Sequence, residues 1–152
     1  RGGKLGIDFL GFKNHIGVFN DPDAVVISDL FLKTLPEREL RSGFAEVIKH
    51  GLIYDKDYFH QISQSSFPNL NWTEVIKRSV EIKSEVVAQD PREAGLRKIL
   101  NFGHTLGHGI ETWYLNSRHS LLHGEAISIG MILQGFLSNK LGRLVYSVLS
   151  EV

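Results

Sequence analysis

Residues 97–111 read RKILNFGHTLGHGIE, and two interleaved patterns run through this stretch. Its apolar residues, from Ile99 to Ile110, recur at helical spacing and form an ordinary core-facing side. Its polar residues follow one another at intervals of 4, 3, 4 and 3, and so share the companion side: Arg97, Asn101, His104, His108 and Glu111. The stretch therefore predicts a helix over residues 96–114, interrupted near Gly103.

The chemistry of this polar side differs from that of a solvated helix face. Such a face usually carries Lys and Glu, whereas this one carries two imidazoles, an amide and a guanidinium, which are groups that contact ligands and metals. An HxxxH pair alone is more often structural than metal-binding. The structural interpretation is also the expected one for His15, His50, His60 and His119.

Four further residues stand out from their local pattern. Lys83 interrupts an apolar stripe on the helix predicted over residues 73–89, either as a snorkelling side chain or as a buried cation that awaits an anionic ligand. Glu46 and Lys49 could form a surface ion pair, and His123 could cap the last helix. Two histidines and one carboxylate with an open fourth position are, however, a common composition for a catalytic zinc site.

Composition limits the classes of protein to consider. The 152 residues correspond to about one domain, and with 42% hydrophobic and 22% charged residues the chain can bury a core. Lys plus Arg and Asp plus Glu both number 17, which argues against a nucleic-acid-binding arm or a membrane-surface patch. There is no cysteine, so disulfides, thiolate zinc sites and thiol chemistry are excluded. With no signal peptide and no run of about 18 apolar residues, we expect a cytoplasmic protein.

The pattern along the chain predicts a mainly α fold with a short loop and strand remnant at the N-terminus. We expect loop over residues 1–23, a strand over 24–28, and helices over 36–54, 57–63, 73–89, 96–114 and 122–141. The first residues lie in a glycine-rich turn and the last are apolar, so we expect an excised part of a longer protein. Residues 1–33 then form the remnant and residues 34–152 the helical domain.

The motifs together resemble the C-terminal part of the 3-dehydroquinate synthase family. The matching strings span nearly all of residues 2–126 in the order of the family: GGK at 2–4, KNHIG at 13–17, TLP at 34–36, AEVIK at 45–49, NFGHTLGH at 101–108 and HGEA at 123–126. The resemblance implies a multihelical, metal- and substrate-binding domain, truncated at its C-terminus, whose NAD-binding N-terminal domain is missing.

The resemblance also implies roles for individual residues. It assigns the zinc ligands to Glu46, His104 and His123, and a substrate contact to Lys49. It places the substrate carboxylate near Lys83, Arg97 and Asn101, and the phosphate and neighbouring hydroxyls near Lys4, Asn14 and His108. Glu93 matches a further active-site carboxylate. The loop before His123 is slightly longer than in many members, which makes His119 a competitor for the third zinc position.

The activity implied for the parent enzyme is the conversion of a seven-carbon keto-acid sugar phosphate (DAHP) to 3-dehydroquinate with release of phosphate, in the shikimate pathway. The cofactors implied are Zn²⁺ or Co²⁺ and, in the parent only, NAD⁺. A homodimer is implied too, and the isolated chain is expected to be inactive and to bind no NAD.

Three alternatives remain at this point. Another sugar-phosphate cyclase, of the 2-deoxy-scyllo-inosose or valiolone type, would use a phosphosugar without a carboxylate. A metal-dependent polyol dehydrogenase would not need the cations Lys83 and Arg97. A non-enzymatic helical metal-binding or interaction domain would use its histidines structurally.

Overall fold

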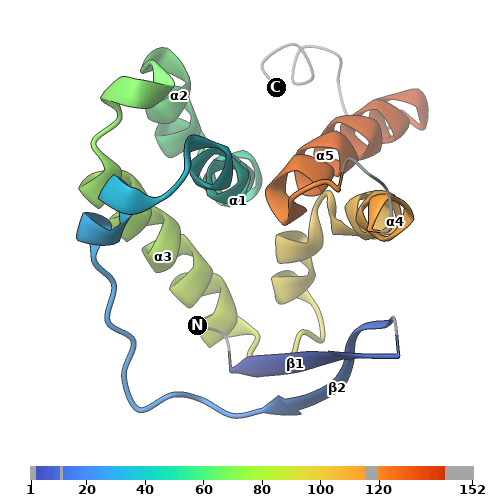
Figure 1. Cartoon of the computed structure of the whole chain (residues 1–152). Helices are drawn as coiled ribbons and strands as arrows, with labels where there is room; N and C mark the ends of the chain where they lie inside the picture. Colours follow the sequence, from blue (N-terminus) through green and yellow to red (C-terminus); the bar gives the residue numbers. More distant parts are fainter. Residues whose placement is uncertain (1–2, 11, 116–119, 143–152) are drawn as a thin grey trace.

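Two short strands followed by helices make up the chain (Figure 1). The computed structural model describes residues 3–10, 12–115 and 120–142. The elements are β1 (Lys4–Phe9), β2 (Phe12–Phe19), η1 (Asp29–Thr34), α1 (Glu37–Tyr54), α2 (Lys56–Gln64), η2 (Phe67–Asn69), α3 (Trp72–Gln89), η3 (Leu96–Asn101), α4 (His104–Tyr114) and α5 (His123–Lys140), where η marks a 3-10 helix. The mainly helical fold expected from the sequence is thus confirmed. Within the described ranges no helix is long and apolar enough to cross a membrane.

The N-terminal prediction was wrong in its details. Residues 1–23 were expected to be loop, but β1 and β2 form an antiparallel hairpin in which Ile7 lies opposite Ile16. Two of the glycines that suggested a loop, Gly6 and Gly17, lie within the strands and face each other. The strand expected over residues 24–28 is not formed, because strand propensity needs a neighbouring edge to pair with. These residues instead belong to the extended connection from the hairpin to η1, drawn in blue in Figure 1.

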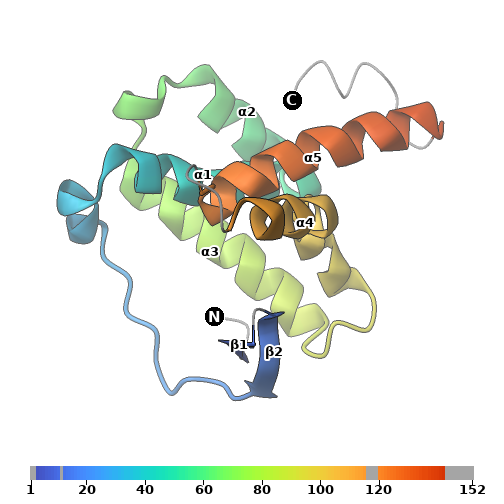
Figure 2. The same ribbon diagram turned by 45° about the vertical axis from the view of Figure 1, so that its right-hand side comes forward.

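One hydrophobic core lies between α1, α2 and α3 (Figure 2). Its buried members are Val47, Tyr58, Phe59, Ile62, Leu70, Val75 and Ile82. At its edge the rings of Phe44, Phe67 and Trp72 pack edge to face, with centroids 5.2–5.7 Å apart. This core fixes the orientation of α1, and with it the direction in which the polar residues of α1 point.

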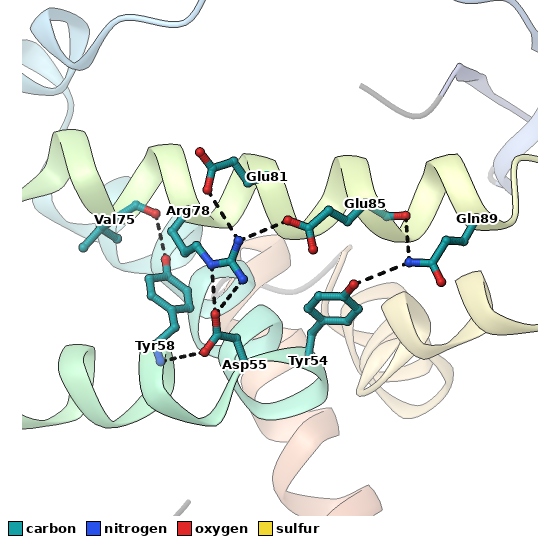
Figure 3. Close-up of polar contacts among 8 residues, drawn as sticks. All are labelled: Tyr54, Asp55, Tyr58, Val75, Arg78, Glu81, Glu85 and Gln89. Carbon is teal, nitrogen blue, oxygen red and sulfur yellow. Dashed lines mark hydrogen bonds and ion pairs between the residues drawn. The ribbon is translucent and has the colours of Figure 1, made fainter.

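Polar contacts also connect the same three helices (Figure 3). Asp55 caps α2 by accepting a hydrogen bond from the backbone N–H of Tyr58 at 2.9 Å. The same carboxylate accepts from Arg78 Nε on α3 at 2.8 Å, and Arg78 also bonds to Glu85. The hydroxyl of Tyr58 donates to the carbonyl of Val75 at 2.7 Å. The turn between α1 and α2 is therefore attached to the middle of α3.

Glycines let α4 and α5 approach their neighbours closely. The predicted break near Gly103 is confirmed, since this residue has φ +81° and separates η3 from α4. A Cβ atom on Gly124, in the first turn of α5, would lie 1.8 Å from the carbonyl oxygen of Ser42 on α1. The Gly124 N–H donates instead to the Ser42 hydroxyl at 2.9 Å. The start of α5 is thereby held against α1, which brings His123 next to Glu46.

Candidate metal and substrate site

Three side chains from three helices converge where α1, α4 and α5 meet. Glu46 Oε1 lies 3.8 Å from His104 Nε2 and 4.0 Å from His123 Nε2, and the two imidazole centroids are 5.4 Å apart. Two ligands about 2.1 Å from a tetrahedral ion are about 3.4 Å apart, so small side-chain movements would bring these atoms onto one ion. In the sequence, Glu46 precedes His104 by more than fifty residues, and His104 precedes His123 by nearly twenty. Only the fold brings these three residues together.

Both histidines are oriented from their far side. The Nδ1 atom of His104 lies 3.3 Å from the Phe102 carbonyl oxygen, and that of His123 lies 3.3 Å from Glu111 Oε2. Since a carbonyl and a carboxylate are acceptors, each pairing favours the tautomer with the proton on Nδ1. Each Nε2 then offers its lone pair towards Glu46.

The protonation states fit a divalent cation. Burial alone would raise the pKa of the Glu46 carboxyl, but the Lys49 ammonium more than offsets this effect and holds the pKa below its ordinary value. Burial, together with the nearby Lys49, lowers the pKa of His104 to about 4, so the imidazole is neutral at pH 7. Glu46 Oε1 is buried and has no hydrogen-bond partner among the described residues. A buried carboxylate oxygen of this kind, facing two imidazoles, suits Zn²⁺.

A fourth polar residue, His108, belongs to the same cluster. Its ring centroid lies 5.1 Å from that of His104 and 5.7 Å from that of His123. Ligand atoms of the three histidines all lie within 4.8 Å of one another, so a site of three imidazoles is a second geometric option. The sequence resemblance assigned His108 to the substrate, and its position beside the candidate ligands is compatible with that role as well.

A pocket of about 150 Å³ adjoins this cluster and is rich in cations. It is lined by Glu46, Lys49, His50, Lys83, Glu93, Arg97, Leu100, Asn101 and His104. Lys49 is 2% exposed, and its ammonium donates to Glu46 Oε2 at 2.6 Å. Burial lowers the pKa of Lys49, against the opposing effect of Glu46. Lys83 is exposed, whereas Lys49 and Arg97 are buried, and a pocket lined by these three cations favours an anionic ligand.

The segment between α3 and η3 aims Arg97 into the pocket. The carboxylate of Asp90 accepts hydrogen bonds from three backbone N–H groups, those of Ala94, Gly95 and Arg97, at 2.7–3.0 Å. Arg97 is 5% exposed, and its Nη1 donates to the Pro91 carbonyl at 2.6 Å.

Glu93, in the same segment, has the left-handed φ of +60°, unusual for a residue other than glycine, and it accepts a hydrogen bond from the Asn101 amide. The structure therefore brings Lys83, Glu93, Arg97 and Asn101 to one pocket.

Lys4 lies on β1 and Asn14 on β2, but their side chains are outside the described part, and so is His119. His15, on β2, is exposed.

Sequence reasoning missed two buried polar residues of the site. His50 was expected to be structural; it bonds to the Ser79 hydroxyl at 2.7 Å, yet it also lines the pocket. Burial lowers the pKa of His50 to about 4. Glu111 was seen on the polar side of its helix but received no role. The sequence did offer one sign of a role for Glu111, since it follows His108 by three residues on the polar side of the helix.

Two family models together match the whole chain. Residues 43–152 match the family described as 3-dehydroquinate synthase C-terminal, and residues 1–42 match the one described as 3-dehydroquinate synthase N-terminal. A 3-dehydroquinate synthase from Acetivibrio thermocellus is 51% identical over 136 residues, which cover 86% of this chain and 37% of the relative. One from Thermosynechococcus vestitus is 47% identical over 148 residues, with 93% and 40% covered. The chain thus spans about two fifths of the length of these curated relatives.

A solved structure has the same fold over almost the entire chain. It is a 2-epi-5-epi-valiolone synthase from Streptomyces hygroscopicus subsp. jinggangensis 5008 with NAD⁺ and Zn²⁺ bound. The match has a TM-score of 0.86 at 29% sequence identity and covers 98% of this chain and 42% of the solved one. The fold expected from the resemblance, that of the sugar-phosphate cyclases, is confirmed.

Proposed function

The chain belongs to the 3-dehydroquinate synthase family, and we propose that it supplies the metal- and substrate-binding part of an enzyme that converts DAHP to 3-dehydroquinate with release of phosphate. The observation that carries the proposal is the meeting of Glu46, His104 and His123 beside a pocket lined by Lys49, Lys83 and Arg97. A site for a divalent cation therefore adjoins a site for an anion, as a hydroxylated acid phosphate requires.

Each group has a separate task in this proposal. Glu46, His104 and His123 hold a zinc ion, which when bound acts as a Lewis acid on substrate hydroxyl oxygens. Arg97 and Lys83 bind the substrate carboxylate, the former through a fork of two N–H donors and the latter as a point charge. Asn101 adds an amide contact and is itself held by Glu93. Lys49 neutralises Glu46 and contacts the substrate, and Lys4, Asn14 and His108 bind around the phosphate.

NAD⁺ belongs to the remainder of the parent protein in this proposal. Dinucleotide binding uses a strand, a glycine turn and the start of a helix. The two strands of the described ranges form only an antiparallel hairpin, so no such unit is present there. The solved relative carries NAD⁺ on a chain of which this one covers 42%, which supports a separate NAD-binding part. A division at residues 33 and 34, a homodimer, a cytoplasmic location, inactivity of the isolated chain, and zinc rather than cobalt remain predictions.

The second candidate is the cyclase of valiolone type, which the structural match favours. The curated relatives of higher identity are 3-dehydroquinate synthases, and the buried cation Arg97 suits a substrate with a carboxylate. A polyol dehydrogenase would leave Lys83 and Arg97 without a ligand to bind. We therefore rank the dehydroquinate reaction first.

Zinc binding tests the metal site directly. The purified chain should bind one Zn²⁺ and melt at a higher temperature when zinc is added. His104→Ala should abolish binding, whereas His119→Ala should not; the opposite result would give the ligand role to His119. A chain that neither binds zinc nor is stabilised by it would support the non-enzymatic interpretation. Assay of the longer protein with DAHP, NAD⁺ and zinc then tests the reaction.

A further inference from the structure

Glu111 is a buried carboxylate for which the proposed reaction has no use. It is only 7% exposed, although ionisable side chains are rarely buried to this extent without a specific partner. It lies on the same side of α4 as His104 and His108, two turns beyond His104 and one turn beyond His108. From there its Oε2 reaches Nδ1 of His123 at 3.3 Å, across the contact between α4 and α5.

His123 needs such a contact more than His104 does. The side chain of His123 is 42% exposed, whereas that of His104 is 18% exposed. His123 is also the first residue of α5, so its imidazole lies at a helix end rather than within a packed layer. Packing therefore restrains the His123 ring weakly, and a hydrogen bond from a rigid group is the effective way to fix its orientation.

The geometry of the hydrogen bond matches the demands of a metal ligand. With Nδ1–H donated to Glu111, Nε2 carries the free lone pair, and this is the atom 4.0 Å from Glu46 Oε1. Carboxylates that accept from the second nitrogen of a ligating histidine fix its tautomer and raise its basicity.

We infer that Glu111 is a positioning residue that fixes the tautomer and orientation of His123 and thereby sets the metal affinity of the site. The inference rests on the proposed metal site and extends it to a residue that contacts neither metal nor substrate. It predicts that Glu111 determines whether the exposed His123 or a competing imidazole serves as the third ligand.

Two measurements on the purified chain test this role. Glu111→Leu should weaken Zn²⁺ binding about 10–100-fold in competition with a chromophoric chelator. Glu111→Gln, whose amide oxygen still accepts a hydrogen bond, should show a smaller loss. Glu74→Leu, which removes an exposed carboxylate from α3, should bind zinc as the wild type does. In the metal-free protein, ¹⁵N NMR of the histidine side chains should show the Nδ1–H tautomer for His123, and Glu111→Leu should abolish that preference.

The two readouts separate the possible failures. Zinc affinity unchanged in Glu111→Leu, with the His123 tautomer also unchanged, would overturn the inference while leaving the metal site intact. A wild-type chain that binds no zinc would overturn the metal site, and the NMR tautomer would still decide whether Glu111 orients His123. If Glu111→Leu does not fold, the Glu111→Gln variant and the wild type decide the question. The inference is overturned if these two proteins bind zinc equally well and His123 of the wild type has the Nε2–H tautomer.

Discussion

Arg97 combines a permanent charge with almost complete burial. Removing an ion from water costs several kcal/mol unless other groups compensate for the lost hydration. The Pro91 carbonyl supplies one acceptor, and the backbone of Arg97 is fixed through Asp90, so the guanidinium is held facing the pocket. Because this guanidinium lines the pocket, a carboxylate that enters can bind to it, and Arg97 is for this reason the residue that best reports on the substrate.

Replacing Arg97 by Met should therefore reduce activity selectively. A hydrogen bond to a charged group is worth about 1.5–3 kcal/mol, so Arg97→Met should lower kcat/KM of the complete enzyme for DAHP on the order of 10–150-fold. For an analogue without the carboxylate, the loss should be much smaller. Steady-state kinetics with both substrates provides the measurement. Equal losses on both would mean that Arg97 serves the fold, and would favour the valiolone or polyol alternatives.

At the level of single residues, the sequence pattern indicated only part of the site. Arg97, Asn101, His104 and His108 were recognisable because their spacing follows one helical side within a single short stretch. Glu46 was not recognisable by spacing, since it reaches the same point from α1 through a packing arrangement that no local pattern records. Its local pattern favoured a surface ion pair with Lys49, and only the resemblance of the AEVIK string suggested a metal ligand.

The position of the start of α5 depends on Gly124, which has no side chain. A Cβ on Gly124 would overlap the Ser42 carbonyl oxygen, so Gly124→Ala should push α5 away from α1 and move His123 from Glu46. We expect a loss of about 3 kcal/mol and a Tm lower by roughly 6–12 °C, together with weaker zinc binding.

Gly43→Ala on α1 is the matched control for this change. It has open space around the added methyl group, and alanine is the better helix former, so it should stabilise the protein by about 0.5–1 kcal/mol. Thermal melts of both variants decide the matter. A Gly124→Ala variant as stable as the wild type would contradict the close approach of α1 and α5.

The turn between α1 and α2 should make stability depend on pH. The hydrogen bond from the Tyr58 N–H, with a further contribution from Arg78, holds the pKa of Asp55 below its ordinary value of 3.8. Because the folded pKa is the lower one, the stabilisation is present above pH 3.8 and is lost as the pH falls through the folded pKa. Asp55→Ala should cost about 0.5–2 kcal/mol at pH 7, mainly as a lost helix cap, and distinctly less near pH 2.

Asp57→Ala controls for charge on the same helix, because Asp57 is exposed. Urea unfolding of both variants across this pH range is the measurement. A cost for Asp55→Ala that does not change between pH 7 and pH 2 would show that the carboxylate charge plays no part in holding the turn.

The helices were predictable to within a few residues because each carries an apolar period and some have a recognisable end, such as the glycine at 142 after α5. The strands were not predictable in this way. Gly6 and Gly17 reduce the strand signal of the hairpin, and they are tolerated because they pair with each other. The β-branched run at 24–28 has the composition of a strand but no partner within the described ranges. Pairing is a property of two segments, so the sequence of one segment does not determine it.

The whole molecule contains a well-packed helical part and a hairpin with little packing of its own. Ile7, Leu10 and Val18 are 59–80% exposed, and a sheet of two strands is marginally stable by itself. The residues of the hairpin match the family model for the N-terminal part, while the site described above lies in the helices. The hairpin thus goes with the N-terminal part of the proposed enzyme. We expect zinc to bind to the helical part and NAD⁺ to bind to the remainder of the parent protein.

Binding of NAD⁺ tests this division. Zinc ligands and the cationic pocket lie within α1, α3, η3, α4 and α5, so the chain should bind zinc. A dinucleotide needs parallel strands that lead into helix N-termini, and the described ranges offer only an antiparallel hairpin. Calorimetric titration of the 152-residue chain should therefore detect no NAD⁺ binding, with or without zinc, whereas a protein of the relatives' full length should bind it. Micromolar binding of NAD⁺ to this chain alone would refute the division, because the nucleotide would then have to occupy the helical part.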